Sequence, residues 1–187
     1  MDWSELNELL VADSWNEELG LHRSNFAFRG RTRADDDLST SLVRLGGDPS
    51  AIERPLLRQF RKYAARDAVP EDSTWNWLAL AQHHGLPTRL LDWTFSPYVA
   101  LHLATARREQ DQDDAVWMID YVRAHELAPK KLREQLEHEG GNVFTTELLA
   151  ACAADFDELA DLGHDVVVFV EPPSLDDRIV NHTPCSR

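Results

Sequence analysis

Apolar residues recur every three or four positions in several stretches of the chain, which is the spacing of an amphipathic helix. Residues 3–19 read as an opening amphipathic helix with apolar residues at Leu6, Leu9, Leu10 and Trp15, and Gly20 follows as an end signal. The same spacing predicts further helices over 50–64, 74–84, 96–108, 129–139 and 146–162. Ser50 to Glu53 has the form of a capping box, but Pro55 follows, so we expect that helix to become regular one turn later.

Shorter apolar runs predict strands at 25–30, 115–122 and 165–170, and an extended segment at 86–93. Strands separated by helices indicate an α+β domain with a small mixed or antiparallel sheet flanked by helices. We expect one domain over 1–187, with an opening helix within 1–20 and a helical insertion at 124–163.

Composition narrows the class of protein. Apolar residues make up 43% of the chain, enough for a core, and only two cysteines are present, which suits a reducing compartment. No basic, apolar start resembles a signal peptide, and no apolar stretch approaches the ~20 residues of a membrane span. We therefore expect a cytoplasmic protein without a membrane segment. The net charge of −14 argues against non-specific nucleic-acid binding.

The charge is unevenly distributed. Residues 111–187 carry 6 basic and 17 acidic groups, whereas the segment from Arg29 to Arg66 carries nine basic groups against five acidic ones. An arginine-rich segment in an acidic protein indicates a local anion site. Ion pairing on a solvent-exposed helix face is the simpler interpretation for most of these arginines.

The densest polar pattern lies at residues 82–94, which read Gln-His-His-Gly-Leu-Pro-Thr-Arg-Leu-Leu-Asp-Trp-Thr. A helix stop and a rigid Gly-Pro turn here bring polar groups together, as a ligand site requires. Asp92 is equally suited to capping a backbone turn. His83 and His84 are adjacent, so on a helix they point ~100° apart and do not form a metal-binding pair. We expect no metal.

The tripeptide Phe28-Arg29-Gly30 is the second landmark. An arginine beside a glycine at the end of a strand presents a fork of donors to a phosphate where the backbone leaves room for it. By itself the tripeptide is a weak signal.

Together the two motifs resemble the FRG domain family. Phe28-Arg29-Gly30 is followed by Leu-x-x-Ser-Leu-x-Arg at 38–44, then by the 82–94 motif and a Ser-Pro helix entry at 96–97. The resemblance covers roughly residues 26–121 and continues weakly to 179. Its order of motifs is also similar to a remote version of the ADP-ribosyltransferase fold.

That resemblance implies NAD as substrate. Arg29, flanked by Phe28 and Gly30, would take the NAD-anchoring place. The segment with Thr88, Arg89, Trp93 and Thr94 would replace the Ser-Thr-Ser strand of the transferase fold. Arg29, joined by Arg89, would neutralise the pyrophosphate, and Trp93 would hold the nicotinamide. The Ser-Thr-Ser spelling at 39–41 belongs to the Leu-x-x-Ser-Leu element and is coincidental.

Catalytic groups implied by the resemblance are His83, His84, Asp92, Glu171 and His182. The chain departs from the family pattern near its end, because His182 stands where a Gln is usual and the Gly and Phe that normally follow are missing before Arg187. This departure favours a truncated C-terminus. It also leaves Glu171 as the nearby carboxylate, which is equally explained as a solvated strand end.

Two functions are expected with equal weight. The first is an NAD-binding, ADP-ribosyltransferase-like enzyme acting as a bacterial toxin or in phage defence. The second is a non-catalytic module of the same fold that binds a nucleotide, or a protein partner through the acidic 124–163 region. A metal-dependent hydrolase or nuclease is a weaker third hypothesis.

Overall fold

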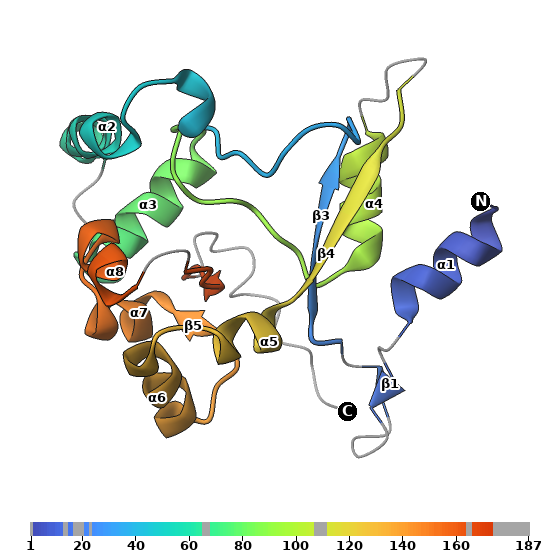
Figure 1. The fold of residues 1–187 in the computed structure, drawn as a ribbon. Helices are drawn as coiled ribbons and strands as arrows, with labels where there is room; N and C mark the ends of the chain where they lie inside the picture. The colour runs from blue at the N-terminus through green and yellow to red at the C-terminus, as the bar shows by residue number, and fades with distance from the viewer. Residues whose placement is uncertain are drawn as a thin grey trace, which may run out of the picture. The chain divides into compact units, whose positions relative to one another are not determined.

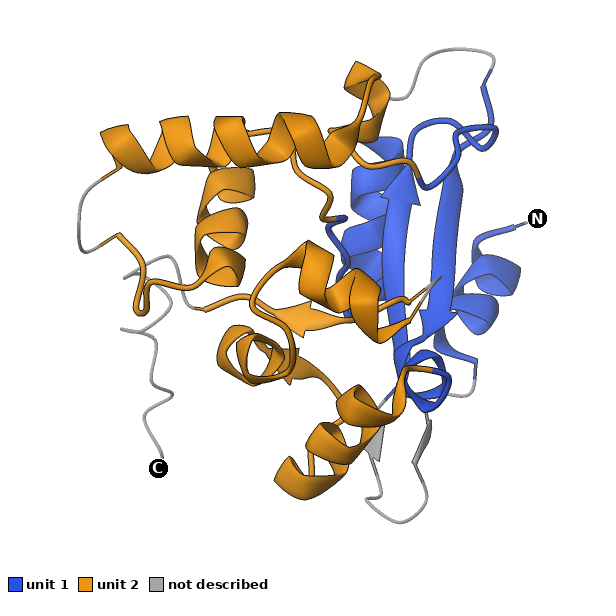
Figure 2. Ribbon diagram, turned by 60° about the vertical axis from the view of Figure 1, so that its left-hand side comes forward, with its two compact units in different colours: residues 1–38, 91–127 blue, residues 39–90, 128–187 orange. Residues whose placement is uncertain are grey.

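The computed structural model describes residues 2–12, 15–16, 21–22, 24–64, 68–106, 112–163 and 166–173. These residues form eight α-helices, one short 3-10 helix and six short strands (Figure 1). Their contacts divide the chain into two compact units, drawn in blue and orange in Figure 2. Unit 1 combines residues 1–38 with 91–127, and unit 2 combines 39–90 with 128–187.

Unit 1 is built around an antiparallel pair of strands. Strand β3 pairs with β4 in a register that runs from Phe26↔Asp120 to Arg31↔Ala115. Helix α4 lies against β3, and the chain also forms a small antiparallel hairpin from β1 and β2. The elements of unit 1 are α1 (Trp3–Val11), β1 (Trp15–Asn16), β2 (Leu21–His22), β3 (Phe26–Arg31), α4 (Pro97–Thr105), β4 (Ala115–Asp120) and α5 (Tyr121–Glu126).

The contact between β3 and α4 explains the glycine of the Phe-Arg-Gly tripeptide. A Cβ atom at Gly30 would lie 1.9 Å from the carbonyl oxygen of Ala100 and 2.6 Å from the backbone nitrogen of Ala104. Both alanines are fully buried. Glycine therefore allows strand and helix backbones to approach, and the space beside it holds α4.

Unit 2 is mainly helical. Its core is a cluster of buried apolar side chains to which each α-helix of the unit contributes, and Leu78, Leu132 and Phe144 in this cluster are fully buried. A short parallel pair, β5 with β6, runs beside it. The elements of unit 2 are η1 (Val43–Leu45), α2 (Pro49–Tyr63), α3 (Thr74–His83), α6 (Lys130–Glu139), β5 (Phe144–Thr145), α7 (Thr146–Cys152), α8 (Phe156–Leu162) and β6 (Val170–Glu171).

The predicted mixture of helices with a small antiparallel strand pair is confirmed, but one shared sheet is not what the described residues form. Their six strands make three separate two-stranded pairs. Helices over 74–84, 96–108 and 129–139 are confirmed as α3, α4 and α6 to within a few residues. In the described part of the chain, no helix is long and apolar enough to cross a membrane.

Two predicted helix boundaries are wrong. The opening helix ends at Val11 rather than near residue 19, since residues 15–16 pair with 21–22 as a hairpin. Helix α2 begins at Pro49, where proline fits the first turn, and the carboxylate of Asp48 accepts a hydrogen bond from the Ser50 backbone. Pro55 lies inside this helix and does not delay it.

The strands expected near residue 90 and over 165–170 are largely absent from the described residues. The 86–93 segment forms no strand, because side chains rather than a neighbouring strand bind its backbone amides at Thr88 and Arg89. Of the described residues 166–170, only Val170 enters a strand, together with Glu171. Val166 and Val168 instead pack against the core of unit 2.

The single helix predicted over 146–162 is two helices, α7 and α8. The chain is extended at Ala153, and the carboxylate of Asp155 then caps α8. A tertiary contact uses the freed backbone, because the indole N–H of Trp75 donates to the Ala153 carbonyl oxygen at 2.7 Å. The spacing of apolar residues carries no information about such a contact, and therefore does not predict the interruption between α7 and α8.

We predict that Gly30→Ala destabilises the protein by about 3 kcal/mol, since the added methyl group collides with backbone atoms of α4 that cannot rotate away. Urea unfolding followed by circular dichroism measures the change. Gly141→Ala is the matched control, because its Cβ would meet its nearest neighbour at an ordinary 3.6 Å. Equal stability of the two variants would contradict the close approach of β3 and α4.

Candidate anion-binding site

The candidate site lies entirely within unit 2, and an ion pair between Arg89 and the buried Glu53 forms its base. Arg89 donates from Nε and Nη2 to Oε2 of Glu53, each at 2.8 Å. The other oxygen of the same carboxylate accepts the Arg89 backbone N–H, also at 2.8 Å. The Glu53 side chain is only 4% exposed, so its charge depends on Arg89 for compensation.

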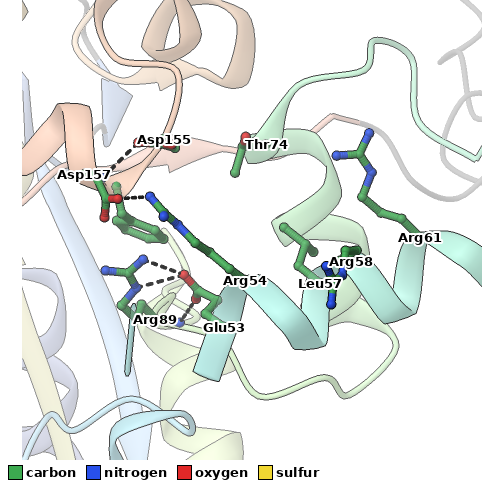
Figure 3. Close-up of a pocket in the computed structure, with 10 residues that line it drawn as sticks. Glu53, Arg54, Leu57, Arg58, Arg61, Thr74, Arg89, Asp155 and Asp157 are labelled. Carbon is green, nitrogen blue, oxygen red and sulfur yellow. Dashed lines mark hydrogen bonds and ion pairs between the residues drawn. The ribbon is translucent and has the colours of Figure 1, made fainter. Parts of the chain in front are cut away.

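The Arg89 guanidinium has two further partners. Its Nη1 donates to the hydroxyl of Ser50 at 3.2 Å, and its carbon lies 4.1 Å from the centre of the Phe156 ring. Arginine stacks well on an aromatic face because its planar charge is weakly hydrated. One side chain of the 82–94 motif is thereby held between α2 and α8 (Figure 3).

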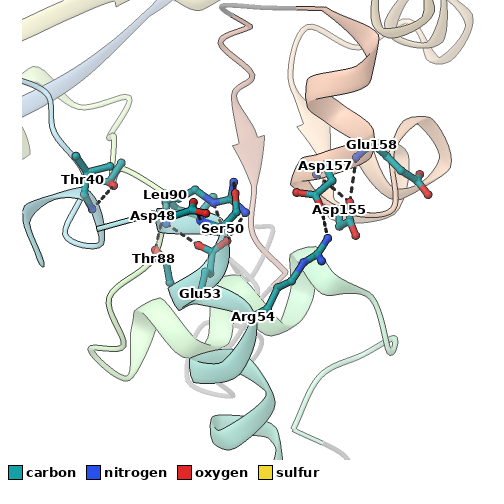
Figure 4. Close-up of polar contacts among 12 residues, drawn as sticks. Thr40, Asp48, Ser50, Glu53, Arg54, Thr88, Leu90, Asp155, Asp157 and Glu158 are labelled. Atoms are coloured by element: carbon teal, nitrogen blue, oxygen red, sulfur yellow. Dashed lines mark hydrogen bonds and ion pairs between the residues drawn. The ribbon is translucent and has the colours of Figure 1, made fainter. Parts of the chain in front are cut away.

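The residue before Arg89 fixes the loop that carries it. Thr88 is fully buried, and its hydroxyl donates to the side-chain carbonyl oxygen of Gln82 while accepting the Leu90 backbone N–H. Its backbone N–H donates to the hydroxyl of Ser41 at 3.2 Å, and its carbonyl oxygen accepts from Leu42. Several of these residues are drawn in Figure 4. Thr88 is therefore committed to internal hydrogen bonds that position Arg89.

A pocket of about 240 Å³ opens above this ion pair. Four arginines line it: Arg89, and Arg54, Arg58 and Arg61 of α2 (Figure 3). The three helical arginines are spaced i, i+4 and i+7, so they follow one face of α2 over roughly 10 Å. The remaining lining residues are Glu53, Leu57, Thr74, Asp155, Phe156 and Asp157.

The arginines differ in how they are paired. Arg54 contacts the carboxylate of Asp157. Arg61 contacts Asp72 at 2.5 Å and lies over the Trp77 ring at 5.0 Å. Arg58 is exposed, and no carboxylate among the described residues forms an ion pair with it. Within the described part of the chain, the pocket therefore presents one guanidinium without a carboxylate partner beside two that contact exposed carboxylates.

The predicted site residues of unit 1 lie together around β3. Arg29 donates from Nη1 to the carbonyl oxygen of Asp92 at 2.5 Å. Phe28 is buried, and its backbone exchanges hydrogen bonds of 2.7 and 2.9 Å with Thr94. The hydroxyl of Thr94 also accepts the Ser96 backbone N–H. The Phe-Arg-Gly strand and the end of the second motif are thus brought together. Trp93, which lies between Asp92 and Thr94 in the sequence, is half-buried.

The predicted catalytic residues of unit 2 are dispersed. His83 and His84 are exposed at the end of α3, with ring centres 5.3 Å apart and the rings nearly perpendicular. Glu171 is exposed at the end of β6, in register with Thr145 of β5. None of the three lines the arginine pocket. His182 lies outside the described residues.

Helix α2 supplies site residues that the sequence patterns did not single out. The excess of basic residues between Arg29 and Arg66 was a signal, but it did not separate the pocket arginines from those paired elsewhere, such as Arg31 with Asp36. The acidic start of α8 gave no signal, because it lies far from α2 in sequence. Helical spacing of Arg54, Arg58 and Arg61 was the pattern that could have found them.

The described residues do not provide a metal site, since no group of three His, Cys, Asp or Glu side chains there is arranged to hold an ion. Cys152 is also a poor nucleophile. Burial raises the pKa of its thiol, which the neighbouring Lys131 ammonium opposes. A thiol that stays protonated in an apolar setting is chemically inert.

These features define an α/β protein with an arginine-lined pocket. The model of the FRG domain matches residues 24–113, and this part of the chain is an FRG domain. The match includes α2, α3 and Arg89, but α8, with Asp155 and Asp157, lies beyond it. Comparison with curated proteins and with solved structures found no match.

We predict that Glu53→Gln lowers the free energy of unfolding by about 2–4 kcal/mol, because it leaves Arg89 without its charge partner. Urea unfolding at neutral pH checks this value. Glu137→Gln, a substitution at an exposed position of α6, serves as control and should change stability by less than about 0.5 kcal/mol. A small effect at Glu53 would mean that the ion pair does not support unit 2.

Proposed function

We propose that this chain binds a phosphate-bearing nucleotide, with its phosphate groups at the arginine pocket of unit 2. The observation that carries the proposal is that four guanidinium groups border one pocket in a protein with a net charge of −14. Guanidinium groups bind phosphate oxygens through pairs of charge-assisted hydrogen bonds. A local concentration of them against an acidic background favours a specific anion.

The dimensions of the pocket support binding of the phosphate end of such a ligand. Sites that enclose a drug-sized molecule measure roughly 300–1,000 Å³. At about 240 Å³, this pocket suits a phosphate or diphosphate group better than a whole dinucleotide. The rest of a nucleotide would extend beyond it.

NAD is the nucleotide that the family resemblance favours. Arg89, the second of the two arginines that the resemblance assigns to the pyrophosphate, is one of the four pocket arginines, whereas Arg29 is not among the residues that line the pocket. Its partners hold it in place before any ligand arrives, so little conformational entropy is lost on binding. NAD, ADP and inorganic pyrophosphate are therefore the first ligands to test.

We predict that Arg58→Gln weakens pyrophosphate and NAD binding by about tenfold, because a charge-assisted hydrogen bond is lost. Isothermal titration calorimetry measures both affinities. Arg133→Gln removes the same charge from the exposed surface of α6 and should leave them nearly unchanged. Equal weakening in both variants would reduce the effect to net charge, and absence of binding in the unaltered protein would refute the proposal.

ADP-ribosyl transfer is the second candidate. The contact of Arg29 with Asp92 and the pairing of Phe28 with Thr94 favour it, because they bring together the two motifs on which the resemblance rests. In such a reaction the nicotinamide leaves the ribose, and a carboxylate or imidazole stabilises the oxocarbenium-like sugar. Asp92, His83, His84 and Glu171 stay the proposed groups for that role.

Nicotinamide release from NAD, followed by chromatography, is the measurement that separates transfer from binding. If the chain is a transferase, release at limiting NAD should fall about tenfold or more in Arg29→Ala, because the resemblance assigns the anchoring of NAD to Arg29 and a charge-assisted hydrogen bond is lost. Tight NAD binding without release would favour the non-catalytic module. Activity lost on adding a chelator would instead favour the metal-dependent hydrolase. A protein partner for residues 124–163 and a role in toxicity or defence stay predictions.

A further inference from the structure

The contact between Arg54 and Asp157 places a carboxylate of the protein inside the arginine pocket. Arg54 comes from α2 and Asp157 from α8, and both line the pocket (Figure 4). Their side chains are 65% and 48% exposed, respectively. Ion pairs this exposed contribute little to stability, because solvent screens both charges. Breaking this contact therefore costs little free energy.

The carboxylates that neighbour Asp157 have other tasks. Asp155 accepts the backbone N–H groups of Asp157 and Glu158 at 2.9 and 3.0 Å, and so caps α8. Glu158 accepts the Ala154 N–H at 2.8 Å. The start of α8 is therefore held by Asp155 and Glu158, and the Asp157 carboxylate is directed to Arg54 instead.

Glu53, the remaining carboxylate in the pocket lining, behaves differently. Glu53 is buried and binds both the guanidinium and the backbone N–H of Arg89. If Arg89 moved away, the buried carboxylate of Glu53 would be left without a compensating charge. Glu53 is a fixed part of the site. Asp157 is the carboxylate that an incoming anion can replace without disturbing the fold.

Building on the proposed function, we infer that Asp157 is an internal competitor for the anion, occupying Arg54 while the pocket is empty. A carboxylate and a phosphate accept from a guanidinium in the same geometry, but phosphate carries more charge and more acceptor oxygens. The ligand must displace Asp157 before Arg54 becomes available. Its apparent affinity is then the intrinsic affinity multiplied by the fraction of molecules in which Arg54 is free of Asp157.

Displacement has a structural consequence within unit 2. The Arg54–Asp157 pair joins α2 to α8, so an anion that takes Arg54 removes this polar link between the two helices. The Arg89–Phe156 contact remains to hold α8. Asp157 thus sets how tightly the pocket binds, and its effect must act through Arg54.

A double-mutant cycle with the full chain and inorganic pyrophosphate tests the inference. Asp157→Asn should tighten pyrophosphate binding about two- to fivefold, the range that an exposed ion pair allows. In a protein that already carries Arg54→Gln, the same substitution should have no effect. Asp161→Asn removes the same charge from α8 away from the pocket and controls for net charge. Unfolding curves confirm that each variant is folded.

The outcomes are distinguishable. Binding that Asp157→Asn does not tighten beyond Asp161→Asn overturns the inference and leaves the proposed function intact. The same is true of a gain that persists in the Arg54→Gln background, because it would be general charge relief. If no variant binds pyrophosphate, the proposed function fails and the inference with it.

Discussion

Unit 2 depends on one electrostatic constraint: the charge of the buried Glu53 must be matched by Arg89. A buried carboxylate without a partner costs several kcal/mol, so the loop that carries Arg89 cannot move away from α2. The backbone N–H of Arg89 binds the same carboxylate, which makes the constraint act on the main chain as well as on the side chain. Fixing Arg89 in turn places its guanidinium on Phe156 and defines the base of the pocket.

The pocket follows from this constraint because α2 contributes both Glu53 and the three arginines. Once Glu53 points toward Arg89, helical geometry directs Arg54, Arg58 and Arg61 along the adjoining face. Positive charge then accumulates beside a buried ion pair that cannot neutralise it. The acidic residues of α8 offset part of that charge. Under the proposed function, the balance between the fixed Glu53 and the exchangeable Asp157 would determine how readily an anion enters.

Unit 1 is governed by packing rather than by charge. Gly30 lets β3 approach α4 at backbone distance, and Arg29 donates to the backbone of Asp92. The Phe-Arg-Gly tripeptide therefore has a structural explanation at each position: Phe28 in the core, Arg29 on a carbonyl oxygen, and Gly30 under a helix. The 82–94 motif is shared between the units, with residues 82–90 in unit 2 and the remainder in unit 1.

The sequence by itself determined the class of fold, the positions of most helices, and the two motifs that identify the FRG domain, because these features depend on local periodicity and on short, specific residue patterns. The excess of basic residues between Arg29 and Arg66 also led to the hypothesis of an anion site, which stays a proposal. Only the tertiary structure decided which arginines line one pocket. It also showed that Thr88 is used in internal hydrogen bonds, that Gly30 allows a close backbone approach, and that Glu171 lies at the end of a separate strand pair. The physical reason is that an ion pair such as Arg54–Asp157 joins residues a hundred positions apart, and local patterns carry no information about such distances.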